Sequence, residues 1–433
     1  MRLGGHIPNR QVHCAALKIP AIDEFAEFLG DYAGRDMSTT MVMVRLLSTL
    51  LKRSELGRYV VPIVPDEART FGMDGLFKVA GIYSPEGQKY RPVDVDSLLP
   101  YREAADGQIL QEGICEVGAM ASFMAAGSAY AVHGLPMIPF YIFYSMFGFQ
   151  RVGDMIWSCG DMMCKGFLLG GTAGRTTLNG EGLQHQDGHS HILASTVPNL
   201  RSYDPAFGFE IAALVREGMH QMYELQEDVF YYLTLYNENY PMPSLVEIAE
   251  QTQVDEGEVL QGVIDGGYCF YRGSDRTECS VHILASGSIM QQALLARDAL
   301  EDLGVGVCIW SITSFVELQR DALACQQHNR DNPQAEARVS RLERMFQGET
   351  GVFIAVTDYM AALAQGVAAW MPPNFEVLGT DGYGLSESRT RLREHFSVDA
   401  MAVAEGALSA LYRNGLLDQS RFELAMHGVR DSK

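Results

Sequence analysis

Apolar and polar positions alternate in blocks along the chain, and the blocks predict helices and strands in turn. Ser38 stands before an apolar stretch with helical spacing, where its hydroxyl can cap the first turn. The first half of the chain contains these predicted elements: a helix at 38–51, a strand at 59–64, a helix at 117–132, a strand at 135–144, a helix at 148–164 and a strand at 229–235. Strands that alternate with helices predict a mainly parallel sheet with helices on both faces.

A polar connection at 237–278 interrupts this alternation, which then starts again. The second half contains these predicted elements: a strand at 281–285, a helix at 289–303, and strands at 305–310, 352–356 and 375–378. The pattern therefore predicts an α/β protein with an N-terminal arm at 1–37, a first domain at 38–236 and a second, smaller domain at 279–433.

Charge and composition narrow the classes of partner. The 54 acidic residues exceed the 33 basic ones, which disfavours nucleic acid and acidic membrane surfaces as partners. Gly134, Pro136 and Pro139 interrupt the longest apolar stretch, so it cannot be one membrane-spanning helix. The eight cysteines form no C-x-x-C pair, and no apolar run follows the N-terminus. We therefore expect reduced thiols, no signal peptide and a cytoplasmic protein.

The segment 174–192 has three histidines and four glycines and follows no helix or strand period, which is typical of a loop that carries a site. His185 and His189 are four residues apart, as in a zinc-binding helix. Asp187-Gly188 lies between them and breaks such a helix, so we expect no metal site here. Imidazole titrates near neutral pH, and this leaves acid/base work or anion binding, with a purely structural loop as the alternative.

Five runs of residues carry a resemblance to a known family: 66–73, 107–116, 138–151, 175–192 and 379–384. They resemble, in order and spacing, the homodimeric bacterial pyruvate dehydrogenase, the thiamine-diphosphate-dependent decarboxylating component of the transketolase-like superfamily. The resemblance covers essentially the whole chain. It implies an oxidoreductase. The expected fold has a pyrimidine-binding domain and a transketolase C-terminal-like domain, each built on a mainly parallel sheet.

The resemblance also implies how the pyrimidine half of the cofactor is held. Glu116 matches the carboxyl group that hydrogen-bonds the aminopyrimidine ring and promotes loss of the thiazolium proton. We expect Glu116, at the start of a small-residue helix, to be largely desolvated, which favours the protonated carboxyl. Ile114 is similar to the wedge that keeps the cofactor bent, and Tyr144 and Phe147 resemble the aromatic wall on which the pyrimidine packs. Ordinary core packing is the alternative for the two aromatic residues.

Other residues are implied to face the substrate. His185 matches the family histidine that faces the substrate, and His191 occupies the place of a transketolase histidine; either could hold a carboxylate or oxyanion. By the same resemblance, three more polar groups lie around the site: Asp66, Glu67 and Arg151. A buried ion-pair network that holds loops is their alternative role. Gln186 stands where the family often has an acid, which leaves the substrate open.

One part of the family pattern is missing. The family holds the diphosphate through Mg²⁺ with a Gly-Asp-Gly motif followed by an asparagine, and no such motif occurs in these 433 residues. We therefore expect a split enzyme, a hetero-oligomer whose partner subunit carries the diphosphate-binding domain and the Mg²⁺. The resemblance also implies two-fold self-association through 114–164, a 2-oxo acid substrate and a lipoyl acyltransferase as a further partner. A carbon–carbon ligase subunit, a fragment of an ordinary pyruvate dehydrogenase and a non-catalytic subunit stay open.

Overall fold

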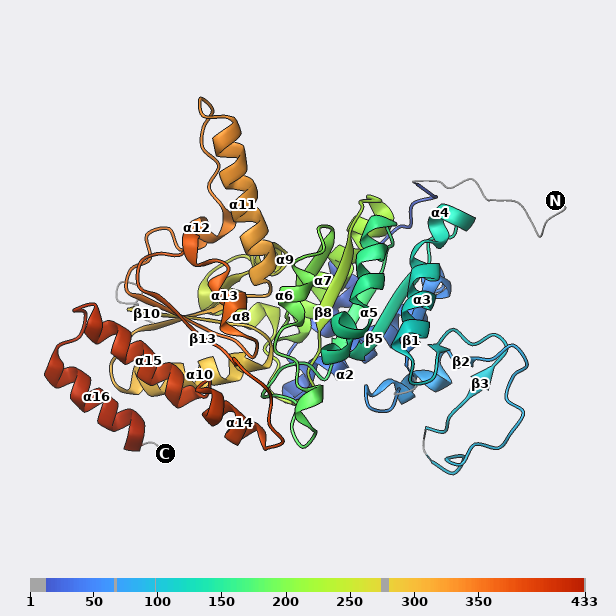
Figure 1. Ribbon diagram of the computed structural model, residues 1–433, viewed down its shortest axis with the longest axis horizontal. Coiled ribbons are helices and arrows are strands. Elements are labelled where there is room, and N and C mark those ends of the chain that lie inside the picture. Colours follow the sequence, from blue (N-terminus) through green and yellow to red (C-terminus); the bar gives the residue numbers. More distant parts are fainter. Residues whose placement is uncertain (1–12, 66–67, 98, 274–279, 432–433) are drawn as a thin grey trace.

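Two α/β units lie side by side in the computed structural model, which describes residues 13–65, 68–97, 99–273 and 280–431 (Figure 1). The first unit contains a six-stranded sheet in the order β4-β1-β5-β6-β8-β7, and all of its strand pairs are parallel. Its strands are β1 (Val60–Val64), β4 (Leu110–Gln111), β5 (Ile138–Tyr144), β6 (Phe167–Gly171), β7 (Leu200–Tyr203) and β8 (Phe230–Thr234). The predicted α/β class with a parallel sheet is confirmed.

Helices of the first unit cover both faces of this sheet. They are α1 (Ala26–Leu29), α2 (Thr39–Leu51), α3 (Glu116–Gly127), α4 (Ala129–His133), α5 (Ser145–Asp161), α6 (Ser190–Ala194) and α7 (Gly208–Met219). The Ser38 side chain accepts a hydrogen bond from Met41 N, so the predicted cap of α2 is confirmed. A small parallel pair, β2 (Ile82–Tyr83) with β3 (Glu103–Ala104), lies beside the main sheet.

The second unit contains a five-stranded sheet in the order β13-β12-β10-β11-β9. Its strands are β9 (Tyr268–Arg272), β10 (Val281–Ala285), β11 (Val307–Ser311), β12 (Val352–Val356) and β13 (Phe375–Leu378). β9 pairs antiparallel with β11 and forms one edge. This strand lies inside the predicted polar connection, which also contains α8 (Leu245–Thr252) and α9 (Glu256–Asp265).

The remaining helices surround the second sheet: α10 (Met290–Asp302), α11 (Phe315–Asp331), α12 (Arg341–Met345), α13 (Ala361–Gln365), α14 (Arg389–Phe396), α15 (Ala400–Arg413) and α16 (Gln419–Asp431). The C-terminal half of α11 projects away from the body of the protein (Figure 1). This half of α11 is largely exposed.

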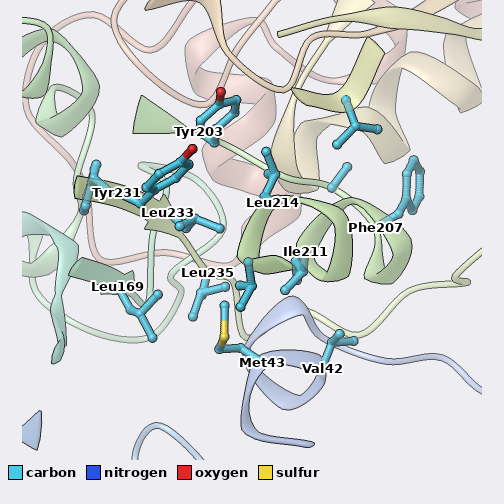
Figure 2. Close-up of a cluster of buried hydrophobic side chains, with 14 of the residues drawn as sticks. Val42, Met43, Leu169, Tyr203, Phe207, Ile211, Leu214, Tyr231, Leu233 and Leu235 are labelled. Carbon is cyan, nitrogen blue, oxygen red and sulfur yellow. The ribbon is translucent and has the colours of Figure 1, made fainter. Parts of the chain in front are cut away.

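The core of the first unit forms where α2 and α7 pack against the middle of the sheet (Figure 2). Met43 of α2 and Leu214 of α7 are fully buried, as are Leu169 of β6 and Leu233 of β8. Each such side chain contributes about 1.5–3 kcal/mol when it leaves water. These contacts fix the strand ends from which the loops of the site begin.

Buried polar groups join the two units. Asp204, which follows β7, accepts hydrogen bonds from the hydroxyls of Thr234, Tyr236 and Ser286, and Ser286 belongs to the second unit. Glu210 of α7 accepts hydrogen bonds from Tyr268 Oη and Ser311 Oγ of the second unit, both at 2.7 Å. The carboxyl-terminal ends of strands from both sheets therefore meet at one polar interface.

Three expectations from composition can be compared with the described residues. No helix in the described ranges is long and apolar enough to cross a membrane. The same ranges contain no group of three histidine, cysteine or acidic residues arranged to hold a metal ion. Free thiols are found at Cys14, Cys115, Cys159, Cys164, Cys269 and Cys325. Cys308 is disulfide-bonded, so the expectation of reduced thiols is wrong at that position.

Candidate active site

Glu116 begins α3, and its side chain is 12% exposed at the carboxyl-terminal edge of the first sheet. Arg151 of α5 reaches across from the next helix, and its Nη1 donates a hydrogen bond to Glu116 Oε1 at 2.5 Å. An acid near a helix N-terminus is favoured by the helix dipole, and the guanidinium adds a second favourable charge. Glu116 is therefore largely buried, and its carboxyl group lies against the Arg151 guanidinium.

Three rings lie beside this ion pair. Tyr144 ends β5, Phe147 lies in the first turn of α5, and the His185 ring lies 5.3 Å from Tyr144 and 5.1 Å from Phe147 between centroids. The Arg151 guanidinium lies 3.9 Å from the Phe147 centroid, which is a cation–π contact. The structure thus brings five of the predicted site residues into one connected cluster.

His185 enters the cluster from the glycine-rich loop. It ends a short 3₁₀ turn, Leu183–His185, and its side chain is 25% exposed. Its Nδ1 is buried without a hydrogen-bond partner in the described part of the chain, and Glu181 Oε2 lies 3.4 Å away. Sequence reasoning missed Glu181, although its spacing of four residues from His185 was a usable signal.

Ile114 lies just before α3 and is 72% exposed, and Val117 in the first turn is 55% exposed. An aliphatic side chain with this exposure has no packing role inside the chain. It is available to contact a bound group or another chain.

His191 lies in α6, and its ring is buried and fully hydrogen-bonded. Its Nδ1 lies 2.7 Å from Ser202 Oγ, and its Nε2 lies 3.0 Å from Thr234 Oγ1. Burial lowers the pKa of His191, and the carboxylates of Asp204 and Asp187 partly oppose this effect. Both ring nitrogens are occupied, so a carboxylate or oxyanion would have to displace a hydroxyl partner. A catalytic role for His191 stays a prediction.

The short helix α6 was not predicted, because the segment 174–192 was expected to be irregular throughout. Asp187 explains the helix: its Oδ1 accepts hydrogen bonds from the backbone of His189 at 2.9 Å and Ser190 at 3.0 Å. These are the donors that a helix N-terminus leaves unpaired. The residue that breaks a zinc-binding helix between His185 and His189 therefore starts the helix that carries His191.

Three predicted positions remain. Asp66 and Glu67 lie outside the described residues. Gln186 is buried, its Nε2 donates to Leu178 O at 2.8 Å, and its Oε1 accepts from Leu385 N at 2.8 Å. These two hydrogen bonds require one donor and one acceptor. The amide side chain supplies both, whereas a carboxylate has no donor. Gln186 therefore links the loop to the second unit.

The sequence matches two family models in chain order. One, described as the pyruvate dehydrogenase E1 component middle domain, matches residues 17–243. The other, described as the transketolase-like TK C-terminal domain, matches residues 266–399. The pyruvate dehydrogenase E1 component of Pseudomonas aeruginosa is 49% identical over 415 residues, which are 95% of this chain and 46% of that protein. The chain thus spans about half the length of the curated relatives that it matches.

Solved transketolases share the fold. The transketolase of Campylobacter jejuni superposes with a TM-score of 0.63 at 18% identity, over 90% of this chain and 49% of that one. A structure described as a split gene transketolase, inactive beta4 tetramer, superposes with a TM-score of 0.58 at 16% identity. This superposition covers 87% of our chain and 98% of the split-gene chain.

The family match covers the loops that bring Glu116, Tyr144, Phe147 and His185 together, and it agrees with the resemblance inferred from the sequence. The second match covers the sheet and helices of the second unit up to residue 399. The chain belongs to the pyruvate dehydrogenase E1 family, and it contains that family's middle domain together with a transketolase-like C-terminal domain.

Proposed function

We propose that this chain supplies the pyrimidine half of a thiamine-diphosphate site in a split enzyme that decarboxylates a 2-oxo acid. The observation that carries the proposal is the joint placement of Glu116, the Tyr144–Phe147 pair and His185 at one sheet edge. An acid, two aromatic rings and a histidine fit an aminopyrimidine and the substrate bound next to it. Bound thiamine diphosphate would supply the electron sink for the decarboxylation.

In this proposal, Glu116 donates a hydrogen bond from Oε1 or Oε2 to a ring nitrogen of the pyrimidine. The donor must be the protonated carboxyl group, and in the present structure Glu116 Oε1 accepts from Arg151 Nη1. A protonated Glu116 would hold the ring nitrogen of a bound pyrimidine, beside the Arg151 side chain. Tyr144 and Phe147, whose rings lie next to this pair, would supply the aromatic surface on which the pyrimidine packs.

The remaining residues act on the substrate side. His185 would hold the carboxylate or oxyanion of the 2-oxo acid through its ring, with the Glu181 carboxyl group 3.4 Å from Nδ1. Ile114, exposed beside Glu116, would act as the wedge against the bound cofactor. Asp66 and Glu67 would add polar groups around the same site, and His191 would support it from the buried network.

The diphosphate and Mg²⁺ are assigned to a partner subunit. Mg²⁺ needs oxygen ligands in near-octahedral geometry, and no cluster of acidic, histidine or cysteine residues in the described ranges is arranged to hold a metal ion. The chain lacks the Gly-Asp-Gly motif and covers about half of its curated relatives. The split gene transketolase, 98% of whose chain is covered, supports the idea that such a pair of domains can exist as a separate chain. The 49% identity to a pyruvate dehydrogenase favours decarboxylation over ketol transfer.

Co-expression tests this proposal. We expect the chain alone to bind thiamine diphosphate with Mg²⁺ weakly and to show no pyruvate turnover. Adding the product of a neighbouring reading frame with the Gly-Asp-Gly motif should restore both. Isothermal titration calorimetry and pyruvate consumption with an artificial electron acceptor measure the two properties. Micromolar binding and turnover by the chain alone would show that no partner is needed.

Glu116→Gln tests the proposed site within the assembled enzyme. We expect exchange of the thiazolium proton of the added cofactor to slow on the order of 100-fold, the scale of a positioned proton-transfer group. His185→Ala should spare this exchange and impair turnover of the 2-oxo acid. Glu227→Gln, an exposed acid far along the chain, is the control and should change neither rate. Wild-type exchange in Glu116→Gln would contradict the assignment.

A further inference from the structure

The histidine loop, residues 174–189, leaves the first unit after β6 and lies against the second unit. Both of its ends are tied there by backbone hydrogen bonds. At the start, Arg175 N donates to Asp358 O at 3.2 Å, and at the end, Met360 N donates to Gly188 O at 2.7 Å. Asp358 and Met360 follow β12 directly. One short segment of the second unit therefore fixes the span of the loop that contains His185.

The Asp358 side chain makes the densest contact with this loop. Its Oδ1 accepts from Thr176 N at 2.8 Å and from Thr176 Oγ1 at 2.7 Å. Its Oδ2 accepts from Thr177 N at 3.2 Å and from Thr177 Oγ1 at 2.6 Å. Four donors thus fill both carboxyl oxygens, and all three residues are buried.

The backbone before these threonines is shaped to allow the contact. Gly174 has a φ of +86°, which favours glycine, and a Cβ atom there would lie 2.2 Å from Asp358 Oδ2. Burial raises the pKa of Asp358, and the hydrogen bonds from Thr177 and Thr176 oppose that rise. Hydrogen-bond donors of the loop therefore stabilise the buried carboxyl group, and the carboxyl group in turn holds the loop in its conformation.

A second segment of the second unit forms hydrogen bonds with the backbone of the loop. Ser386 Oγ donates to Glu181 O at 2.8 Å, and Arg389 Nε donates to Thr177 O at 2.6 Å. The His185 ring itself contacts Tyr144, Phe147 and Glu181, which all belong to the first unit. Among the contacts of the described residues, the second unit therefore acts on the imidazole through the loop that carries it.

We propose that Asp358 is a positioning residue that fixes the histidine loop through Thr176 and Thr177 and thereby places His185 in the active site. The inference rests on the proposed function in one respect, the substrate-facing role of His185. Its structural part, the dependence of the loop on Asp358, does not need that role.

Hydrogen–deuterium exchange of the full chain tests the structural part without any activity. We expect amides of residues 174–189 to exchange at least about tenfold faster in Asp358→Ala than in wild type, with a smaller increase in Asp358→Asn, which keeps one acceptor oxygen. Asp399→Asn is the matched control, because Asp399 caps α15 by accepting from Ala402 N at 3.2 Å. It should leave exchange in the loop unchanged.

Paired Thr176→Val and Thr177→Val substitutions provide a second variant if Asp358→Ala fails to fold. They remove both hydroxyl donors and keep the carboxyl group and the side-chain volume, so we expect the same local increase in exchange at about the scale of Asp358→Asn. Unchanged exchange of residues 174–189 in Asp358→Asn and in the paired valine variant would overturn the proposal.

The assembled enzyme tests the consequence for His185. In Asp358→Asn we expect kcat/KM for the 2-oxo acid to fall about tenfold, while exchange of the cofactor proton, which depends on Glu116, stays at the wild-type rate. Adding Asp358→Asn to His185→Ala should then cause no further loss, since both act through one group. Additive losses would overturn the positioning role. If no partner produces turnover, the proposed function fails, and the exchange experiment still decides the role of Asp358 in the loop.

Discussion

The two hydroxyl partners of His191, Ser202 and Thr234, suit a neutral imidazole, which has one donor and one acceptor nitrogen. Burial lowers the pKa of this histidine below its ordinary value of 6.5, because the charged ring would lose its hydration. The nearby carboxylates do not reverse that direction. The neutral ring is therefore part of what keeps this region folded.

A pH dependence of stability follows from this shift. As the pH falls below about 6.5, His191 binds a proton in the unfolded chain more readily than in the folded chain, so unfolding is favoured. The stability that the neutral His191 ring contributes is fully present above that pH and is lost as the pH falls. We expect His191→Gln to lower the melting temperature at pH 7.5 and to lose less between pH 7.5 and 5.5 than wild type. His133→Gln, at an exposed histidine, should follow wild type. Parallel losses in all three proteins would refute this account.

The candidate site was predictable where its residues are near each other in sequence. Tyr144 and Phe147 share the junction of β5 and α5, and their rings lie 5.8 Å apart, as a strand–helix junction brings them together. The pairing of Arg151 with Glu116 spans 35 residues and depends on how α5 packs against α3. Hydrophobic spacing does not encode that packing, so the acid and the arginine were expected to have separate roles.

Helix α5 shows how a single glycine controls the position of the site. Gly148 is buried, and a Cβ atom there would lie 2.1 Å from Cε2 of Phe143, whose ring is fully buried in the core. Phe147 and Arg151 are on the same helix, on either side of this contact. The close approach of α5 to β5 therefore sets where these two side chains lie relative to Glu116.

Two substitutions in α5 should have opposite effects. Gly148→Ala must push the helix away from Phe143, and we expect it to destabilise the protein by about 1–3 kcal/mol, as overpacking does. Gly153→Ala meets nothing within 4 Å in the same helix. It should stabilise the protein by about 0.5–1 kcal/mol, because alanine loses less entropy in a helix. Denaturant unfolding measures both. Equal effects of the two substitutions would show that the contact with Phe143 is unimportant.

At the level of elements, apolar runs predicted β1, β5, β8 and the parallel strands of the second sheet, and a capping signal predicted α2, whereas β4, β6 and β7 of the first sheet were not predicted. The predicted strand at 281–285 has the bounds of β10, and that at 352–356 has the bounds of β12. The edge strand β9 was missed, because it lies in a segment dominated by polar residues. It becomes a strand by pairing with β11, a partner that comes later in the chain. The predicted domain boundaries stay predictions.

One exposed apolar face is a candidate surface for self-association. Val117, Ala121 and Ala125 are exposed on α3 and are spaced four residues apart, so they share one side of the helix. Ile114 extends this side toward Glu116. Small side chains allow close packing of two helices, and a two-fold contact would place the same face on both copies.

Sedimentation velocity tests this surface. We expect wild type to self-associate and Ala121→Arg to shift the protein toward the monomer, because a buried guanidinium without a partner is costly. Ala335→Arg adds the same charge at an exposed position after α11 and should not change the distribution. A wild-type protein that stays monomeric, both with and without a partner chain, would count against self-association through 114–164.

The contacts of Asp358 with the histidine loop also bear on how the gene can change. A recombination event that exchanged one domain between relatives would have to keep Thr176, Thr177 and Asp358 together. Otherwise the hydroxyl donors of the loop would lose their acceptor in the second unit. Gly174 belongs to the same inherited set. The two domains should therefore descend together, and chimaeras joined between 244 and 256 should work only when both parents share these four residues.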